Sequence, residues 1–563
     1  MAGLTLDAWS LVFEQATRED LCSLCLVSRS FNTLATPLLY RSITLVQGDA
    51  DIDDFSTQGR HWLLLSRLED DANGNLRNLV QEVALCRPPG IRINTSFLRR
   101  LTTDNCLSKL ITSLPNLRRV TITISRLQTA HLIRTISTHP RTPELILRLD
   151  TGECAFADQH LPCVSSLTVA VDPFDERNGP NERMLTVQRL FLNCPALRSF
   201  SLTLFENYGG CVRHIPQHPV IRTFRLTGTE RFPPLQELGL NGYRVRDELE
   251  WIPFRDCVQW SRLSGLTLGP LPTGDNLLSR ITGYATSLEA LRVYAYADED
   301  QENSEGLERL LLSFDSLRTL EVRGYVCSVE AIGNHAGLST LCLHEDEPGE
   351  RSERQRRVFT AQELDYLDSR CPKLRSLAID IQRGDNKLPD DVLEKLSTGF
   401  ANLSHLSLHF ELGLSTLKNP ITPVLNYTTA QTIGQSIFTH RRESGIPISS
   451  AQSFKLTLWT GSSFRRFPQW EPRFCAFERL HTATYEVRLL CLHATPAPAR
   501  TSKSSDRQVE VEVRHLQRER LELIEAGKAK PDTILEKKDL GVQVRAAVEG
   551  PEKRGGRWSP DYV

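Results

Sequence analysis

Few residues in this sequence are of types and spacings that could bind a metal ion, and in each case the spacing is unfavourable. Cys22 and Cys25 are a close cysteine pair, but no second pair supplies the two further ligands of a structural zinc site. We expect both to be reduced thiols in a helical core. His405 and His409 would suit one metal ion on a helix. On a strand they share a face about 13 Å apart, at roughly 3.3 Å per residue.

Signatures of common catalytic sites are absent from the sequence. It contains no P-loop, Gly-x-Ser-x-Gly, His-Glu-x-x-His or dinucleotide-binding glycine pattern. We therefore expect no enzyme activity, no cofactor and no metal site. The formal net charge of −2 gives nucleic acid or an anionic membrane no strong field to bind, so neither is expected as a partner.

The compartment is indicated by the start of the chain and by its cysteines. Met1 to Phe13 has no basic segment, and Asp7 interrupts its apolar residues, which is unlike a secretory signal. No apolar run is long enough to span a membrane. The fourteen cysteines are scattered singly, as expected of reduced thiols. We expect a cytoplasmic or nuclear protein, or one found in both places.

Helical spacing predicts three short helices at the N-terminus. Asp7 is the expected cap of a helix that runs to Ala16. Thr17 and Asp20 resemble a capping box at the start of the second helix. The third helix is expected to stop at Pro37, because proline cannot continue the backbone hydrogen-bond ladder. Helices this short need a partner or the rest of the chain to cover their apolar faces.

The order of these residues resembles the F-box, particularly that of fungal F-box proteins. The resemblance rests on Leu4 to Trp9, Leu11 to Phe13, Glu19 to Leu21, Leu24 to Arg29, Phe31 and Leu34 to Ile43. Thr5 stands where the family usually has proline.

The F-box docks onto a Skp-type adaptor of a cullin-based SCF ubiquitin ligase. The resemblance therefore implies a pool of adaptor-contact and small-core residues: Leu4, Thr5, Trp9, Val12, Phe13, Leu21, Leu24, Val27 and Phe31.

A pattern of the form Leu-x-x-Leu-x-Leu recurs between residues 76 and 485. The copies are Val80-Val83-Leu85, Leu117-Val120-Ile122, Val164-Leu167-Val169, Leu197-Phe200-Leu202, Leu235-Leu238-Leu240, Leu263-Leu266-Leu268, Leu288-Leu291-Val293, Leu317-Leu320-Val322, Leu338-Leu341-Leu343, Leu374-Leu377-Ile379, Leu403-Leu406-Leu408 and, more weakly, Phe454-Leu456-Leu458.

The last two apolar positions of each copy are two residues apart, as on one face of a strand. Helical spacing follows some copies, for example from Glu305 to Phe314. Strand, crossover and parallel strand is the unit that leucine-rich repeats resemble. We expect an α/β protein: an N-terminal three-helix F-box, then an irregular leucine-rich-repeat solenoid whose parallel strands line a concave face, then a flexible charged tail.

The expected organisation has four parts. Residues 1–45 are the F-box module, 46–75 a connecting segment, 76–485 the solenoid, and 494–563 a linker with a mostly disordered tail. Within the tail, Gln508 to Ala526 can be drawn as an amphipathic helix, which would be either transient or a docking helix.

Two stretches within the solenoid depart from the repeat pattern. Ile221-Phe224-Leu226 begins too close to Leu235 for a parallel crossover, so one of these two segments is not expected to be a ladder strand. Glu345 to Arg357, an acidic run that passes into a basic one, is expected to be a solvated loop, with a partner-binding loop as the alternative.

A binding surface is expected where tyrosine and arginine gather between the apolar positions of adjacent strands, because both types are enriched at binding hot spots. By alternation, His344, Asp380, His405 and His409 also face outward on later strands. The alternative is that all of these are ordinary exposed strand residues. The proposed target-binding set is Arg292, Tyr294, Tyr296, Glu321, Arg323 and Tyr325.

The functional expectation follows from the module and the repeats together. The chain would be the substrate-recognition subunit of an SCF ubiquitin ligase, binding a Skp-type adaptor and its cullin through the F-box and an unidentified protein substrate through the repeats. The alternative is a non-catalytic leucine-rich-repeat interaction scaffold that acts outside a ubiquitin ligase.

Overall fold

The computed structural model divides the chain into two compact units, Met1–Arg262 and Leu263–Val563. We describe each unit by itself. The residues that the structure describes are 5–46, 64–70, 74–86, 105–124, 128–149, 154–171, 182–204, 223–271, 277–295, 301–324, 327–345, 347, 356–383, 387–413, 421–446, 454–461, 483–489 and 511–515.

Three helices open the first unit, α1 (Leu6–Glu14), α2 (Arg18–Cys25) and α3 (Arg29–Arg41). Thr17 and Asp20 form the predicted capping box of α2. The cap of α1 is Thr5, whose hydroxyl accepts a hydrogen bond from the Ala8 amide at 3.4 Å, so the prediction of Asp7 as the cap was wrong.

The prediction that Pro37 ends the third helix was also wrong, because Pro37 lies inside α3. Proline inside a helix costs about 3 kcal/mol through its missing N–H and its ring. Its neighbours Leu34, Leu38 and Leu39 pack against the small core of the module. That burial offsets the cost and carries the helix on to Arg41.

The helices α1–α3 enclose a core of their own. Phe13, Leu21 and Ala35 are buried, and Trp9 and Phe31 pack against them. The ring centroids of Trp9 and Phe31 lie 5.1 Å apart and those of Phe13 and Phe31 5.2 Å apart, which is the range of favourable aromatic pairs.

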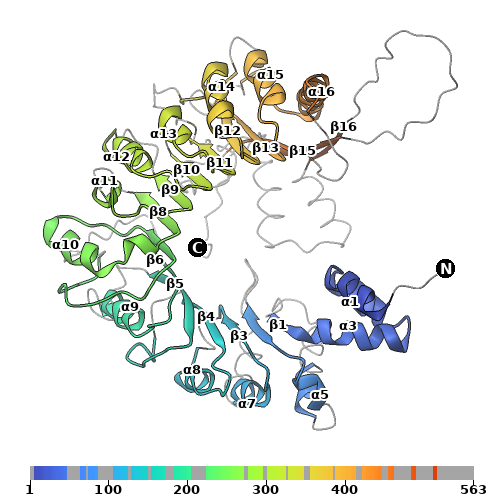
Figure 1. The fold of residues 1–563 in the computed structure, drawn as a ribbon, viewed down its shortest axis with the longest axis vertical. Coiled ribbons are helices and arrows are strands. Elements are labelled where there is room, and N and C mark those ends of the chain that lie inside the picture. The colour runs from blue at the N-terminus through green and yellow to red at the C-terminus, as the bar shows by residue number, and fades with distance from the viewer. Residues whose placement is uncertain are drawn as a thin grey trace, which may run out of the picture. The chain divides into compact units, whose positions relative to one another are not determined.

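The rest of the first unit is built from strands and helices in alternation. In the described part of this unit, seven strands pair in chain order, each parallel to its neighbour, and the helices lie in a separate layer (Figure 1). The elements are β1 (Ser42–Val46), α5 (Gly74–Arg77), β2 (Glu82–Cys86), α7 (Cys106–Ser113), β3 (Arg119–Ile122), α8 (Ala130–Ser137), β4 (Glu144–Leu149), β5 (Val164–Val171), α9 (Glu182–Leu192), β6 (Ser199–Leu204), β7 (Glu237–Asn241), α10 (Glu248–Cys257) and the 3-10 turn η4 (Trp260–Arg262).

The second unit repeats the same alternation. Strands β8 to β14 are parallel and pair in chain order, while β14, β15 and β16 are antiparallel. The elements are β8 (Gly265–Leu271), α11 (Leu277–Ile281), β9 (Ala290–Ala295), α12 (Gln301–Leu312), β10 (Thr319–Arg323), α13 (Val329–Gly333), β11 (Thr340–His344), α14 (Ala361–Arg370), β12 (Ser376–Ile381), α15 (Asp390–Thr398), β13 (His405–Phe410), α16 (Tyr427–Glu443), β14 (Lys455–Thr460), β15 (Ala483–Leu489) and β16 (Val511–His515).

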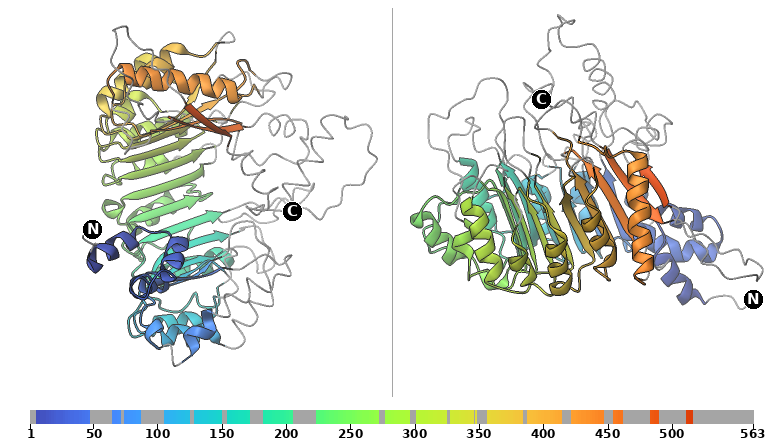
Figure 2. Two further views of the ribbon diagram at one scale, coloured as in Figure 1. Left: turned by 90° about the vertical axis from the view of Figure 1, so that its right-hand side faces the viewer. Right: turned by 90° about the horizontal axis from the view of Figure 1, so that it is seen from above.

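Every predicted copy of the repeat pattern coincides with a strand. In each, the two apolar residues that are two apart point to the helices, as Leu291 and Val293 do in β9, where both are fully buried. Figure 2 shows the helices of the second unit along one face of its strands. The other face is free of helices among the described residues, and the alternate side chains, such as Arg292, lie on it.

The structure settles the doubtful segment before Leu235. Thr223 to Leu235 contains no strand, and Phe224 is buried among aromatic rings. The strand that joins the sheet is β7. The prediction that one of the two segments is not a ladder strand was therefore confirmed. Strands β1 and β4 were not predicted. The helix expected over Gln508 to Ala526 was wrong where the structure describes it, because Val511 to His515 form β16.

None of the helices in the described ranges is long and apolar enough to cross a membrane.

The aromatic core of α1–α3 predicts a local stability effect. Phe13→Ala should destabilise the module by about 3–5 kcal/mol, because it leaves a cavity in a core of few residues. Amide hydrogen exchange of the full chain should then show lost protection in α1–α3 and unchanged protection in β9 and β10. Leu26→Ala is the matched control, since Leu26 is 88% exposed and its truncation should change stability by no more than about 0.5 kcal/mol. Unchanged protection in Phe13→Ala would contradict this account of the core.

Candidate functional site

The structure divides the residue pool that the F-box resemblance implies. Phe13 and Leu21 are buried in the core of the module, and Trp9, Leu24 and Phe31 are partly buried against it. Thr5 is exposed and caps α1. Leu4 lies outside the described residues.

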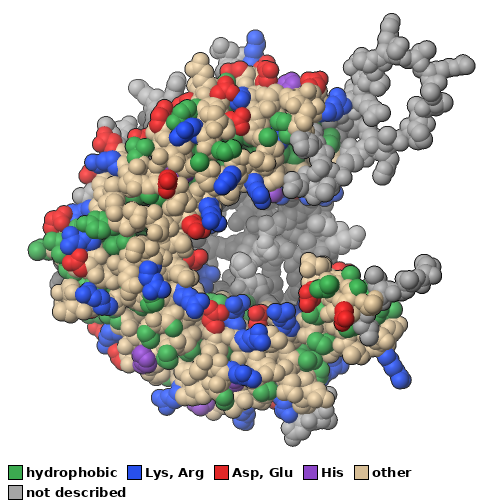
Figure 3. All heavy atoms as spheres, viewed as in Figure 1, with side chains coloured by type: hydrophobic (Ala, Val, Ile, Leu, Met, Phe, Trp, Pro, Cys, Tyr) green, Lys and Arg blue, Asp and Glu red, His purple; other side chains and the backbone are tan. Residues whose placement is uncertain are grey.

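The remaining members, Val12 and Val27, are exposed. Val12 is 48% and Val27 66% exposed, and their neighbours Leu11 and Leu26, which were not in the pool, are 66% and 88% exposed. We call these four residues the apolar face of the module. Hydrophobic side chains are visible on the surface of the N-terminal helices in Figure 3. Leu11 and Val12 lie on α1, and Leu26 and Val27 directly follow α2. Large exposed apolar side chains on a small module are typical of an interaction surface.

The cysteine pair lies in the same module. Cys22 is exposed and Cys25 partly buried, and both thiols are free. The expectation that both are core thiols was therefore wrong for Cys22. The helical spacing puts the first of the two on the outer side of α2.

The predicted target-binding residues of β9 and β10 come together on the helix-free face of the second unit. The Glu321 carboxylate forms ion pairs with both Arg292 and Arg323, at N–O distances of 3.5 Å and 2.7 Å. The Arg323 guanidinium lies 5.6 Å from the centroid of the Tyr294 ring. These four residues therefore form one linked surface cluster, in which a single carboxylate serves two guanidinium groups. Tyr296 and Tyr325 lie outside the described residues.

A glycine fixes the backbone beside this cluster. Gly269 in β8 has φ +137°, and a Cβ there would collide with the carbonyl oxygen and Cβ of Tyr294. The register between β8 and β9 shifts at the same place, between Leu268 and Leu271. Only glycine allows so close an approach with this φ, so Gly269 sets the position of Tyr294.

The cluster continues along one row of the sheet. In the register of neighbouring strands, Tyr294 lies opposite Arg323 and Arg323 opposite His344. Asp380 likewise lies opposite His409, and His409 opposite Trp459. His344 and Asp380 are joined by a hydrogen bond of 2.8 Å from Nδ1 to Oδ1. Parallel strands lie about 4.8 Å apart, which brings equivalent side chains of neighbouring strands into contact. The polar row runs across six strands: Tyr294, Arg323, His344, Asp380, His409 and Trp459.

The second half of this row is not exposed, contrary to the expectation for His344, Asp380 and His409. Their exposed fractions are 5%, 4% and 1%. His405, on the same strand as His409, is exposed as expected.

Three charged residues between β11 and α14 lie buried beside the row. Glu345, Glu347 and Arg356 are 2%, 5% and 4% exposed, so the expectation of a solvated loop was wrong for these residues. The Glu345 amide donates to Asp380 at 2.7 Å, and the Glu345 carboxylate accepts from the Arg357 amide at 3.1 Å.

Glu347 is held in the same way. Its carboxylate accepts hydrogen bonds from the backbone amides of Leu412 and Gly413, at 2.5 and 3.1 Å. A buried carboxylate without such donors would cost several kcal/mol, and these amides supply the compensation. Glu345 and Glu347 are therefore each held by hydrogen bonds between their buried polar groups and neighbouring residues.

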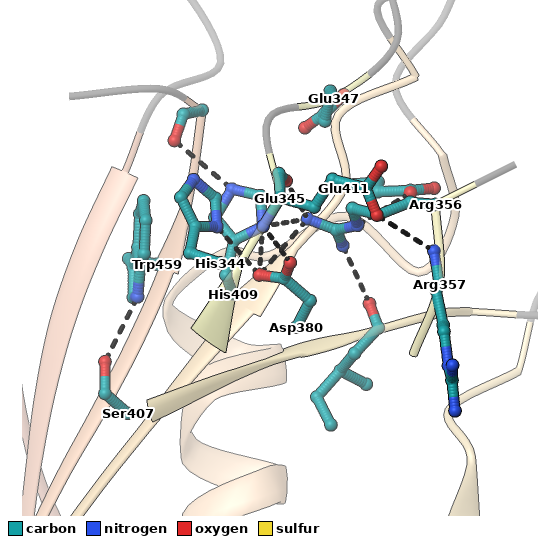
Figure 4. A network of polar contacts seen from close by, with 12 residues as sticks. His344, Glu345, Glu347, Arg356, Arg357, Asp380, Ser407, His409, Glu411 and Trp459 are labelled. Carbon is teal, nitrogen blue, oxygen red and sulfur yellow. Dashed lines mark hydrogen bonds and ion pairs between the residues drawn. The ribbon is translucent and has the colours of Figure 1, made fainter. Parts of the chain in front are cut away.

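The centre of this polar network is the guanidinium of Arg356 (Figure 4). Nη1 donates to Nδ1 of His409 at 2.5 Å and lies 3.4 Å from Oδ1 of Asp380, while Nε lies 2.9 Å from a carboxylate oxygen of Glu411. Nη1 and Nη2 also donate to the carbonyl oxygens of Glu345 and Ile381, at 3.4 Å each.

The histidines form the walls of the same pocket. The rings of His344 and His409 lie 4.6 Å apart, and the Trp459 indole lies 4.9 and 4.3 Å from them. Trp459 is oriented by a hydrogen bond from its Nε1 to the Ser407 hydroxyl at 3.1 Å.

His344, Asp380 and His409 are of types that bind metals, and their ligand atoms lie within 4.8 Å of one another. The Arg356 guanidinium takes the place that a cation would need, since it contacts both Asp380 and the His409 Nδ1. The Nδ1 of His344 is already engaged by Asp380. The arrangement therefore fits an internal arginine rather than a metal ion.

The hydrogen bonds fix the tautomer of His409. Arginine only donates, so Nδ1 of His409 accepts from Arg356 and carries no proton. Nε2–H then donates to the Gly461 carbonyl at 3.2 Å. Burial, followed by the nearby positive charge of Arg356, holds the pKa of His409 well below its usual 6.5. His409 is neutral throughout the physiological range.

This depressed pKa predicts how stability depends on pH. Below about pH 6.5 the unfolded chain protonates this histidine and the folded chain does not, so stability falls as pH decreases and is unaffected above that pH. The contribution of one such group is up to about 1.4 kcal/mol per pH unit. In urea unfolding of the second unit between pH 5 and 7.5, His409→Asn should be less stable than the wild type at pH 7.5 and show a shallower fall towards pH 5. Equal slopes would show that His409 titrates normally.

Comparisons with known proteins do not identify the chain. No protein-family model and no curated protein matches it. Among solved structures it is similar to a chain of the crystal structure of the mouse RP105/MD-1 complex, with 13% identity and a TM-score of 0.28. That match covers 68% of this chain and 62% of the other, so the chain spans less than two thirds of its length. A TM-score this low supports no conclusion about function.

Proposed function

We propose that this chain is the substrate-recognition subunit of an SCF-type ubiquitin ligase. The α1–α3 module binds a Skp-type adaptor, and through it a cullin. The helix-free face of the second unit binds the protein to be modified. The chain itself performs no ubiquitin transfer and acts by holding the target close to the enzyme that does, which raises the effective concentration of the reacting groups.

One observation carries this proposal. The module has its own core, yet leaves Leu11, Val12, Leu26 and Val27 exposed, with fractions of 48% to 88%. Leaving four large apolar side chains in water forgoes roughly 1.5–3 kcal/mol for each one that could be fully buried. A docked partner recovers that energy. The resemblance of Leu4 to Ile43 to the F-box names the adaptor as that partner.

The surface cluster on β9 and β10 supports the second half of the proposal. Arg292 is 45% and Arg323 25% exposed at the side chain, and Tyr294 is half-buried beside them. Arginine and tyrosine give most binding energy when they sit at the centre of an interface. This cluster is therefore the expected contact surface for the target.

Adaptor binding is tested with charge substitutions on the apolar face. Leu26→Asp combined with Val27→Asp should abolish co-purification of the Skp-type adaptor and cullin, because docking would bury two unpaired carboxylates. Both residues are exposed, so the fold of the variant should be unchanged, which circular dichroism checks. The matched control is Leu249→Asp, since Leu249 on α10 is a leucine with 83% exposure.

The outcomes separate the candidate functions. Retention of the adaptor by the Leu26→Asp/Val27→Asp variant would contradict docking through this face. Capture of the adaptor without a cullin would favour the alternative, an interaction scaffold that acts outside a ubiquitin ligase.

Target binding is tested on the surface cluster. Arg292→Ala, Tyr294→Ala and Arg323→Ala together should weaken binding of a purified target by at least about thirtyfold, since hot-spot residues cost about 2 kcal/mol or more. Targets are first identified as proteins that cross-link to the intact chain. Adaptor binding should be unchanged. Tyr427→Ala with Arg442→Ala, two exposed residues of the same types on α16, is the control. Full affinity in the triple variant would place the target surface elsewhere.

A further inference from the structure

The pocket around Arg356 has the donor and acceptor pattern of a guanidinium-binding site. Nη1 donates to the imidazole nitrogen of His409 and to the Glu345 carbonyl, and Nη2 donates to the Ile381 carbonyl. Two carboxylates lie beside the group, that of Asp380 at 3.4 Å from Nη1 and that of Glu411 at 2.9 Å from Nε. A guanidinium offers five N–H donors in a fixed planar fork, whereas an ammonium offers three from one point. Acceptor atoms lie within 3.4 Å of all three guanidinium nitrogens, which the single nitrogen of an ammonium could not contact together.

The charge of the pocket also favours a cation. Asp380 and Glu411 are two carboxylates beside one guanidinium, and Glu347 lies close enough to act on the neighbouring Arg383. The histidine that faces Arg356 is neutral and offers a lone pair. An arginine removed from this pocket would leave buried acceptors without a donor, which is costly.

The occupant of the pocket does not come from a strand or a helix of the sheet. Arg356 precedes α14, which begins at Ala361, and its side chain is 0% exposed. Its neighbour Arg357 points to a different place, where it pairs with Glu363 at 2.9 Å and remains 48% exposed. Of these two consecutive arginines, Arg356 thus lies buried at the polar row. The first half of that row, Tyr294 and Arg323, is partly exposed.

We propose that this pocket recognises an arginine side chain of the target protein, and that Arg356 is a built-in occupant that competes with it. This inference rests on the proposed function, because it takes the helix-free face of the second unit as the target surface. It adds a ligand class, a peptide segment bearing an exposed arginine, and an autoinhibitory contact. Target arginine enters when Arg356 leaves, and the apparent affinity is reduced by the fraction of time that Arg356 occupies the site.

The test measures binding of small probes to the full chain, without adaptor or target. The probes are N-acetyl-arginine amide, N-acetyl-lysine amide and N-acetyl-citrulline amide. The readout is the fluorine NMR signal of 5-fluorotryptophan at Trp459, assigned with Trp459→Phe, because this indole contacts both pocket histidines. The variants are Arg356→Gly and the matched control Arg357→Gly, which removes the adjacent exposed arginine.

The proposal expects a specific pattern. Arginine amide shifts the Trp459 signal in the wild type and in Arg357→Gly with equal, weak affinity, and binds about tenfold or more tightly to Arg356→Gly. Lysine and citrulline amides cause no comparable shift. Asp380→Asn in the Arg356→Gly background abolishes binding, since it removes a charged acceptor of the guanidinium.

Three outcomes would overturn the proposal. Binding to Arg356→Gly alone, with none to the wild type, would make Arg356 a permanent structural group. No binding to a folded Arg356→Gly would show that the pocket does not accept a free guanidinium. Equal binding of lysine amide would make it a general cation site. If Arg356→Gly does not fold, the absence of a response of the wild type to arginine amide would still contradict the displacement of Arg356 by a target arginine. Co-purification of the adaptor is independent of all these outcomes, so failure here is distinguishable from failure of the proposed function.

Discussion

The in-register pairing of parallel strands is the constraint on which both units depend. Each strand places its alternate residues at the same height as those of its neighbours, about 4.8 Å apart. Leucine thus meets leucine along the face that packs against the helices, as with Leu291 and Leu320, and polar residues meet along the other face. A single residue's type therefore has little meaning until its row is known. The polar row from Tyr294 to Trp459 exists because six strands present the same position.

The same constraint explains why the charged residues Glu345, Glu347 and Arg356 lie buried. Three neighbouring strands place His344, Asp380 and His409 side by side. Burying these polar side chains without hydrogen-bond partners would be costly. Arg356 supplies the charge, and Glu345 supplies a backbone amide to Asp380. Glu347 adds hydrogen bonds from the backbone amides of Leu412 and Gly413. The network links packing to function, since it decides which part of the row remains open to a partner.

The repeat strands could be predicted from the sequence because the signal is local. Each has two apolar residues two apart, preceded by a third. Strand β4 was missed because Leu145, Leu147 and Leu149 lack the preceding apolar residue, and β1 because its residues fall at the end of the stretch that resembles the F-box. The antiparallel strands β15 and β16 carry no repeat pattern. The surface cluster was predictable from alternation, whereas the place of Arg356 depends on contacts with His409, 53 residues away.

The measurement that tests the central claim most directly is hydrogen exchange of the full chain with and without a purified Skp-type adaptor. The account predicts new protection in α1 and α2, around Val12 and Val27, with no change over β9 and β10. That result would place the adaptor on the apolar face and leave the polar row available to a target. Protection on the strand face of the second unit, or no protection anywhere, would contradict the assignment of α1–α3 as the docking module.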